Sequence, residues 1–364
     1  MAVETVKAAL FETMRYLLQF RIDDGTIRRR KLRNPLGFSP IRWPKIFRPR
    51  STSIQRKLRT ISLSLFIIHF PLIAQGDKTF SLPLDHLRNW AEKAVISIPN
   101  AIVKGHSRVH DAVDDCEMHF AARVSDYDGD PAGVVLEPMN VCKQKFFGKP
   151  TYSRAHWISF GDLLKGKTVE VAGVPRIWPE HLEGEQTASN PHHALEIHPV
   201  TQLTFGAKLY DFSSFIYAPN GFDGIKTETA QSILAQTVVG VVRNQNAIDV
   251  DFASGRIGNF CTLRIRIRRP FIESLAGGHR MQGEVLFSNS QNIPVQFLSI
   301  GGSQIDSAIS RFQGGSMNQK TFDALVLFSL APNRLLEAAT QSHGERVGVN
   351  HPLQLILYGV PQVQ

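Results

Sequence analysis

The chain has 364 residues, 43% of them hydrophobic and 20% charged, which is the composition of a folded globular protein and excludes a disordered one. Its three cysteines are too few for a small disulfide-rich scaffold. The formal charge of +9 does not indicate nucleic-acid binding, because residues 1–76 hold 15 Lys/Arg against 4 Asp/Glu, whereas the remaining residues hold 26 against 28.

The basic excess therefore belongs to a leader, which we divide at residue 60. Residues 27–59 contain twelve basic and no acidic side chains, with five prolines or glycines. Residues 61–76, ISLSLFIIHFPLIAQG, contain an apolar run of about 14 residues, too short for a membrane span and typical of a signal-peptide core. We expect cleavage near Ala74-Gln75-Gly76 and an extracytoplasmic mature protein, periplasmic or secreted, that begins near Asp77.

The long basic segment 1–60 is unusual in front of a signal peptide. Either the gene start lies downstream of Met1, which is our preferred interpretation, or residues 61–76 form an uncleaved anchor with a basic cytoplasmic arm. Apart from such an anchor, we expect no stable membrane span. The remaining alternatives are a buried strand or helix at 61–76 and a DNA-binding arm upstream of it.

After residue 76 the sequence is typical of a mainly β protein. Residues 84–96, LDHLRNWAEKAVI, have the apolar spacing of a short amphipathic helix. Clusters of Asn, Asp, Gly and Pro then separate predicted strands, which are residues 116–124, 133–141, 167–174 and 193–205. Short strands at this spacing favour a small barrel or a sandwich.

Two of these segments carry a family resemblance. The residues GKTVEVAGVPRIWPEH and NPHHALEIHPVTQL resemble the last part of an OB-like barrel in uncharacterised extracytoplasmic bacterial proteins, in which a V-x-V-x-G strand precedes an E-I-H-P-V strand. The resemblance covers about 90 residues, from DDCEMHFAARV to LTF. It implies an OB-like β-barrel over residues 77–206 and a location outside the cytoplasm. It implies no activity, because OB barrels host many functions.

Two cysteines fit the export interpretation. A hairpin centred on Gly129 places Cys116 and Cys142 opposite each other, which predicts a disulfide if the protein is exported. Two buried free thiols are the alternative. The acidic turn between them partly matches a calcium loop, but Pro131 stands where that loop needs glycine, so we interpret it as an ordinary aspartate-rich turn.

Two predicted strands share the pattern Glu-x-His. Because side chains alternate along a strand, Glu117 and His119 share one face of the first strand, and Glu196 and His198 share one face of the second. If the strands are neighbours, these groups form a ligand set for zinc, manganese or iron, or a general base with its orienting partner. Our preferred interpretation is a structural polar set in which Glu196 accepts from a backbone or histidine N–H.

Residues 207–364 are expected to form a second β-rich domain, an antiparallel sheet or sandwich with two short helices. Within NFCTLRIRIRRP, a strand places Arg264, Arg266 and Arg268 on one face. We expect that face to be solvated, with an anion or polysaccharide site as the alternative. Cys261 is expected to be buried on the opposite, apolar face.

The sequence contains no Walker loop, dinucleotide-binding glycine motif, Gly-x-Ser-x-Gly elbow or Cys-x-x-Cys. We therefore predict an exported, non-catalytic binding or interaction module that needs no cofactor and has an unknown ligand or protein partner. The alternative is a metal-dependent hydrolase that uses zinc or a similar ion at the Glu-x-His residues. A nucleic-acid-binding OB barrel is a third hypothesis, which the near-neutral charge after residue 76 disfavours.

Overall fold

The computed structural model describes residues 20–23, 26–29, 78–104, 108–111, 116–124, 133–143, 151–182, 194–212, 224–254 and 257–359. The chain divides into two compact units, Met1–Ile68 and His69–Gln364. In the first unit, β1 (Phe20–Asp23) pairs with β2 (Thr26–Arg29) as an antiparallel hairpin. The predicted signal-like segment 61–76 and most of the basic run lie outside the described residues. No helix in the described stretches is long and apolar enough to cross a bilayer.

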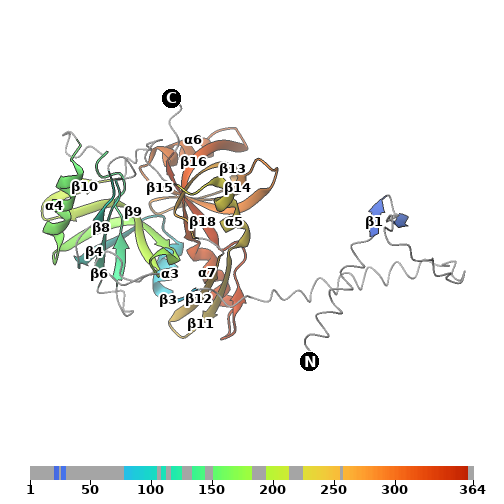
Figure 1. The fold of residues 1–364 in the computed structure, drawn as a ribbon, viewed down its shortest axis with the longest axis horizontal. Helices are drawn as coiled ribbons and strands as arrows, with labels where there is room; N and C mark the ends of the chain where they lie inside the picture. Colours follow the sequence, from blue (N-terminus) through green and yellow to red (C-terminus); the bar gives the residue numbers. More distant parts are fainter. Residues whose placement is uncertain are drawn as a thin grey trace, which may run out of the picture. The chain divides into compact units, whose positions relative to one another are not determined.

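Five strands of the second unit close into a first barrel, cyan to yellow-green in Figure 1. They are β4 (Ile96–Val103), β6 (Met118–Val124), β7 (Gly133–Leu136), β8 (Thr168–Ile177) and β9 (Leu195–Phe205). Their order around the barrel is β4-β6-β7-β9-β8, and β8 pairs with β4 to close it. Only the β7–β9 pairing is parallel. Helix α4 (Arg154–Leu164) connects the third strand to the fourth. This strand order is that of an OB-like barrel, as predicted.

Short strands extend this barrel at two places. β5 (Arg108–Val109) pairs with β6, and β10 (Lys208–Asp211) pairs with β9. The predicted domain boundary after residue 206 thus lies in the turn between β9 and β10.

The predicted elements of this region are present but shorter at some ends. The strand predicted over 133–141 ends at Leu136, because Pro138 has no N–H to donate and Asn140 adopts a positive φ of 55°. The helix predicted over 84–96 is α3 (Leu84–Ala91). It ends early because the backbone N–H groups of Ala94 and Val95 donate to the carbonyl oxygen of Ala276, at 2.9 and 3.3 Å.

The C-terminal region closes into a second barrel, orange to red in Figure 1. Its strands are β13 (Phe260–Leu275), β14 (Gly278–Leu286), β15 (Asn292–Ile300), β16 (Gln319–Leu330) and β18 (Leu353–Gly359). The order is β13-β14-β15-β18-β16, with only β15 and β18 parallel and helix α6 (Gln304–Gln313) between the third and fourth strands. The β-rich domain is confirmed, and it has the same strand order as the first barrel.

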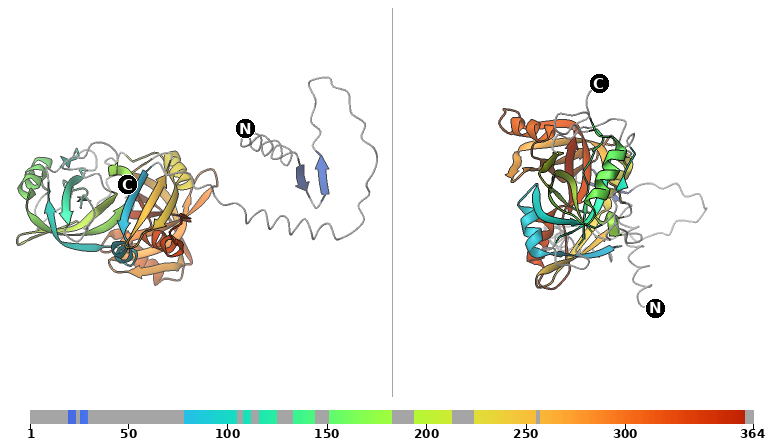
Figure 2. Two further views of the ribbon diagram at one scale, coloured as in Figure 1. Left: turned by 90° about the horizontal axis from the view of Figure 1, so that it is seen from below. Right: turned by 90° about the vertical axis from the view of Figure 1, so that its left-hand side faces the viewer.

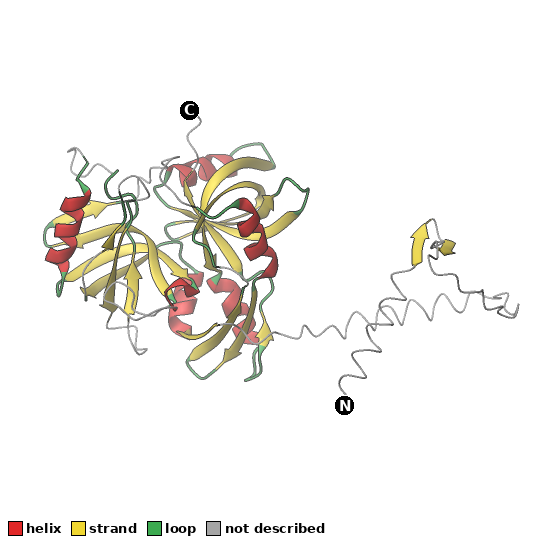
Figure 3. Ribbon diagram, viewed as in Figure 1, coloured by secondary structure: helices red, strands yellow, loops and turns green. Residues whose placement is uncertain are grey.

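A small four-stranded sheet packs with helices beside the barrels, as the three colours of Figure 3 and the two views of Figure 2 show. Its order is β17 (Val347–Gly348), β11 (Val238–Arg243), β12 (Ala247–Ala253) and β3 (Lys78–Pro83). Helix α3 packs against α7 (Pro332–Gln341), and α5 (Thr227–Gln236) leads into β11. The sheet therefore joins segments from the beginning and the end of the second unit.

Candidate functional site

The two motifs that carry the family resemblance meet at one glycine. β8 and β9 pair as antiparallel strands, with an irregular register around Gly173. A methyl group on Gly173 would overlap the side chain of Ile197 and the carbonyl oxygen of Pro199. Only glycine allows so close an approach of the strands. Beyond this irregularity, Arg176 lies directly opposite Glu196.

Side chains alternate along β9 as the sequence predicts. Leu195 and Ile197 belong to the hydrophobic core, and Glu196 and His198 occupy the alternate positions. These alternate positions are nevertheless shielded from solvent, because both side chains have 0% exposure. The second barrel covers them: the Arg176 Nε donates to the Phe328 carbonyl oxygen at 2.7 Å, and the His198 ring meets the Phe260 ring edge-on at 5.5 Å.

A cluster of charged residues fills this junction between the two barrels. We call it the junction cluster, and its members are Glu117, Glu137, Arg176, Glu196 and His198, all of which are buried. Burying charges is costly unless they are paired and hydrogen-bonded. The partners of each member therefore decide what the cluster can do.

Arg176 and Glu196 form the fully buried ion pair of the cluster. Arg176 Nη1 lies 2.5 Å from Glu196 Oε2, and Nη2 lies 3.4 Å from Glu180 Oε2. Burial alone would lower the pKa of Arg176, but the carboxylates of Glu196 and Glu180 outweigh it and raise that pKa. Glu196 thus has an arginine partner, which the structural interpretation from the sequence did not name, and that interpretation stays a prediction. The same Glu196 oxygen lies 3.4 Å from His198 Nδ1.

Glu117, Glu137 and His198 form the other half of the cluster. His198 Nδ1 makes an ion pair with Glu137, and Nε2 lies 3.7 Å from Glu117 Oε2. One potential ligand atom from each of the three residues lies within 4.8 Å of the others. Burial would lower the pKa of His198, but Glu137 and Glu117 outweigh it and raise the pKa to about 10. The two carboxylates therefore favour the charged form of the imidazole in this arrangement.

The structure brings the four predicted ligands into one region, but their side chains do not all converge on one point. The Glu-x-His strands β6 and β9 are not neighbours, because β7 lies between them. Glu117 and His198 approach each other, Glu196 is committed to Arg176, and His119 Nδ1 lies 3.9 Å from Glu137 Oε1. The structure therefore separates the predicted set and brings in Glu137.

Sequence reasoning missed Glu137 and Arg176. Glu137 directly follows the apolar strand β7, and its backbone N–H donates to the Ile197 carbonyl oxygen at 3.1 Å, which continues the parallel pairing with β9. Arg176 is a single charge in the apolar run VAGVPRIW. A lone charge inside an otherwise buried strand was the available signal, because such a residue needs a buried partner.

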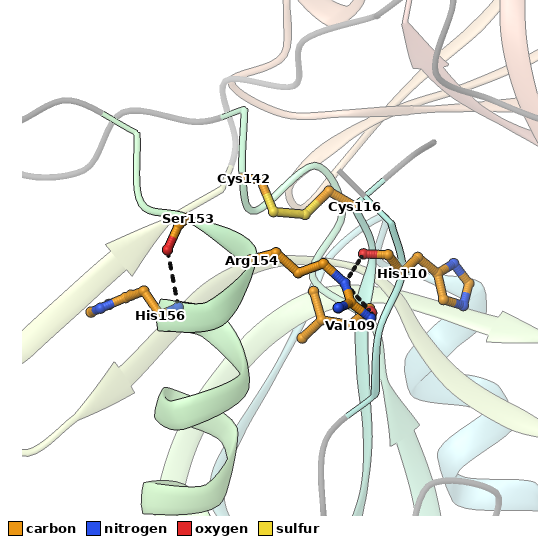
Figure 4. Close-up of a disulfide and its surroundings, with 7 residues drawn as sticks. All are labelled: Val109, His110, Cys116, Cys142, Ser153, Arg154 and His156. Atoms are coloured by element: carbon orange, nitrogen blue, oxygen red, sulfur yellow. Dashed lines mark hydrogen bonds between the residues drawn. A yellow bond between two sulfur atoms is a disulfide. The ribbon is translucent and has the colours of Figure 1, made fainter. Parts of the chain in front are cut away.

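The predicted cysteine pair is confirmed. Cys116 and Cys142 form a disulfide with their Cα atoms 5.8 Å apart (Figure 4). The β6–β7 ladder pairs Phe120 with Leu136, so the cysteines lie just beyond its end, where the Val141 N–H donates to the Cys116 carbonyl oxygen at 3.1 Å. The disulfide joins the segment that carries Glu117 to the one that follows Glu137.

Helix α4 is anchored close to this disulfide. Its Ser153 side chain accepts from the backbone N–H of His156 and caps the helix, as Figure 4 shows. The Arg154 Nε donates to the carbonyl oxygens of Val109 and His110, at 3.0 and 2.9 Å. The segments around the disulfide are thus held in place by these hydrogen bonds as well as by the Cys116–Cys142 bond.

Cys261 and the Asp306–His279–Ser299 cluster contain residue types that often act in catalysis, but neither is arranged for it. Cys261 is buried as predicted, and burial raises the pKa of its thiol to about 11, which opposes thiolate formation. Asp306 lies between His279 and Ser299, with its Oδ1 2.8 and 2.5 Å from them. A nucleophilic serine needs the histidine in the middle, so this set is structural.

The three arginines of β13 face carboxylates on the neighbouring strands. Arg264 Nη1 lies 3.2 Å from Asp323, and Glu284 receives Arg266 at 2.5 Å and Arg268 at 2.7 Å. The hydrogen bond from Arg266 lowers the pKa of Glu284. Much of the positive charge on this face is therefore paired within the second barrel.

Open depressions on the surface involve other residues. One of about 730 Å³ lies between the end of α5, the start of β15 and residues 348–352. Another of about 730 Å³ lies near residues 83–86 and 244–247. Neither is lined by a member of the junction cluster.

Comparisons with protein-family models, curated proteins and solved structures gave no significant match. The first barrel agrees with the OB-like fold that the sequence resemblance implies for residues 77–206. Membership of that family stays a prediction.

Proposed function

We propose that the protein is an extracytoplasmic, non-catalytic binding module built from two OB-like barrels. The burial of the junction cluster is the observation that carries this proposal. The acidic, basic and metal-ligating residues that converge there are at most 3% exposed, with Glu117 the least buried. A substrate has no access to groups so enclosed, whereas the barrel surfaces remain available for recognition.

The disulfide supports a location outside the cytoplasm. Cys116–Cys142 bridges two segments of the first barrel, and such bonds persist mainly in oxidising compartments. The predicted signal-like segment 61–76 is consistent with the same destination.

The charges disfavour nucleic acid as the ligand. Outside residues 1–76 the chain holds 26 Lys/Arg against 28 Asp/Glu, and the arginines of β13 have acidic partners. Binding to a phosphate backbone needs an excess of positive charge along a groove. We therefore favour a protein or an uncharged ligand.

A metal-dependent hydrolase is the second candidate, because Glu117, Glu137 and His198 converge. A hydrolase would show metal-dependent turnover of a substrate, whereas a binding module would show none. Purified full-length protein, supplied with Zn²⁺ or Mn²⁺, is tested against a chromogenic phosphodiester and a chromogenic ester beside the His198→Ala variant. We expect rates equal to those of the blank for both proteins. Metal-dependent turnover that is lost in the variant would replace our proposal with the hydrolase.

The binding function itself is tested by ligand-induced stabilisation. A ligand that binds only the folded protein raises its thermal midpoint in a saturable manner. We expect such a shift from a peptide or an uncharged oligosaccharide and none from a thymidine oligonucleotide. A shift by the oligonucleotide alone, lost at high salt, would support the nucleic-acid-binding hypothesis instead.

A further inference from the structure

We propose that Glu117, Glu137 and His198 form a structural site for a divalent transition-metal ion inside the barrel junction. The site would sit outside any ligand-binding surface, so the inference goes beyond the proposed binding function and does not depend on it. It differs from the set predicted by the Glu-x-His pattern, because Glu137 takes the place of Glu196 and His119.

The donor atoms come from three separate elements. Glu117 immediately precedes β6, Glu137 immediately follows β7, and His198 lies on β9. One ligand atom from each lies within 4.8 Å of the other two. A zinc ion binds nitrogen and oxygen ligands at about 2.0–2.2 Å, so its ligands stand roughly 3–4 Å apart. Small side-chain adjustments would therefore bring all three onto one ion.

Carboxylates outnumber basic side chains in the junction cluster, which holds Glu117, Glu137 and Glu196 against Arg176 and His198. Glu196 is engaged by Arg176 at 2.5 Å, and Arg176 also reaches Glu180 at 3.4 Å. Glu117 and Glu137, at 3% and 2% exposure, both approach the His198 imidazole. A divalent ion held by both carboxylates would pair with them directly, and burying a charge costs much less when the charge is paired.

The types of donor atom select the class of ion. Two carboxylates and an imidazole suit zinc, manganese or iron, whereas calcium takes six to eight oxygen ligands. The Met139 sulfur lies 3.2 Å from His198 Nε2, and His119 Nδ1 lies 3.9 Å from Glu137. A thioether and a second imidazole beside the three donors favour a softer ion than calcium. We therefore take Zn²⁺ as the probe and Ca²⁺ as the contrast.

The backbone holds the three donors in place. The Glu137 N–H donates to Ile197 at 3.1 Å, and the Glu137 carbonyl accepts from Val200 at 3.0 Å, on either side of His198. The Met118 N–H, next to Glu117, donates to Pro138 at 2.9 Å. The disulfide at Cys116 adds a covalent link to the same segments. Such preorganisation reduces the cost of assembling a metal site.

The first experiment uses the wild-type, full-length protein. Elemental analysis after purification without chelator should find about one equivalent of a first-row transition metal. After removal of that metal with a chelator, Zn²⁺ should restore the thermal midpoint and Ca²⁺ should not. Protein without metal whose thermal midpoint is unchanged by both chelator and Zn²⁺ would overturn the proposal.

The second experiment assigns the ligands. Glu137→Gln and Glu117→Gln keep the shape of each side chain but replace a carboxylate with a neutral amide. Loss of an outer-shell partner already weakens metal binding by about 10–100-fold, so loss of a direct ligand should weaken Zn²⁺ binding by more than about 100-fold. Glu284→Gln, in the second barrel, is the matched control and should leave Zn²⁺ affinity unchanged.

Unchanged Zn²⁺ affinity in both ligand variants would contradict the assignment, and equal loss in the Glu284→Gln control would show that the effect is not specific. If Glu137→Gln does not fold, Glu117→Gln and the chelator experiment on wild type still decide the matter. Because the readouts are metal stoichiometry, thermal midpoint and Zn²⁺ affinity, a failure here leaves the proposed binding function untouched.

Discussion

The first barrel has a fully buried ion pair on the wall that meets the second barrel, whereas the second barrel, with the same strand order, has ion pairs on β13 that are partly or largely exposed. In the first, Arg176 and Glu196 pair at 0% exposure. In the second, Arg264 and Asp323 pair with side chains 59% and 50% exposed. The polar groups buried in the second barrel include Gln296 and Gln354, whose amides hydrogen bond at 3.1 Å.

This difference shows that strand order does not determine where a barrel keeps its charges. The outer wall of the first barrel is buried because the second barrel covers it, and its polar residues must therefore find partners within the protein. Removing one member of a buried ion pair typically costs about 3–5 kcal/mol. An exposed pair contributes about 0–1 kcal/mol. The same kind of substitution should thus have very different effects in the two barrels.

The largest effect is expected from Glu196→Ala. It leaves Arg176 at 0% exposure without its closest counter-ion and should lower the free energy of unfolding by about 3–5 kcal/mol. The matched substitution in the second barrel, Asp323→Ala, should cost less than about 1 kcal/mol. Urea denaturation of the two variants measures both values. Equal losses would show that burial of the first pair has no energetic consequence.

The disulfide should give the next largest effect, and it belongs to the first barrel alone. Replacing Cys116 and Cys142 with serine opens a loop with a sequence separation of 26 residues, which costs about 3.5 kcal/mol in the chain-entropy model. Denaturation of the double variant measures the loss. Alkylation of denatured, unreduced wild type should label Cys261 alone. Labelling of all three cysteines would refute the bond.

The neutral network of the second barrel should respond less strongly than the buried charges of the first. Gln296 donates to Asn333 at 2.9 Å and to Gln354 at 3.1 Å. Gln296→Leu removes these hydrogen bonds without stranding an ion, so we expect a loss of about 1–3 kcal/mol. The measurement is the urea midpoint. A loss as large as that of Glu196→Ala would remove the distinction between the two interiors.

The smallest effect on stability is expected from the titration of Glu284, which pairs with arginines of β13. Hydrogen bonding to Arg266 lowers the pKa of Glu284 in the folded state. Its stabilising contribution is therefore present above the unfolded pKa of about 4.3 and is lost as pH falls through the lower folded pKa. Glu284→Gln should flatten this acid loss slightly, by less than about 1 kcal/mol. A stability–pH curve with the same slope below pH of about 4.3 in both proteins would contradict the assignment.

Much of the local structure was predictable from the residues themselves. The alternation of Leu195 and Ile197 with Glu196 and His198 on β9 follows from the geometry of a single strand. The pairing of Cys116 with Cys142 followed from a short hairpin with a recognisable turn. A β-rich second domain was also predicted, but as a sheet or sandwich. The closure of its strands into a barrel was not predicted, because β13 pairs with both β14 and the distant β16.

The sequence by itself determined which residues on each strand lie opposite the apolar core, since side-chain alternation needs no information beyond the strand. Only the tertiary structure decided that these positions in the first barrel are buried. Glu137 meets His198 through the parallel pairing of β7 with β9, and Arg176 meets Glu196 through the irregular pairing of β8 with β9. Both pairings join segments that are far apart in the chain or out of regular register. The second barrel, which covers them, is formed by residues still farther along the chain. No local pattern encodes such contacts, because they are stabilised by the closure of the barrel and by the burial of one barrel wall against another.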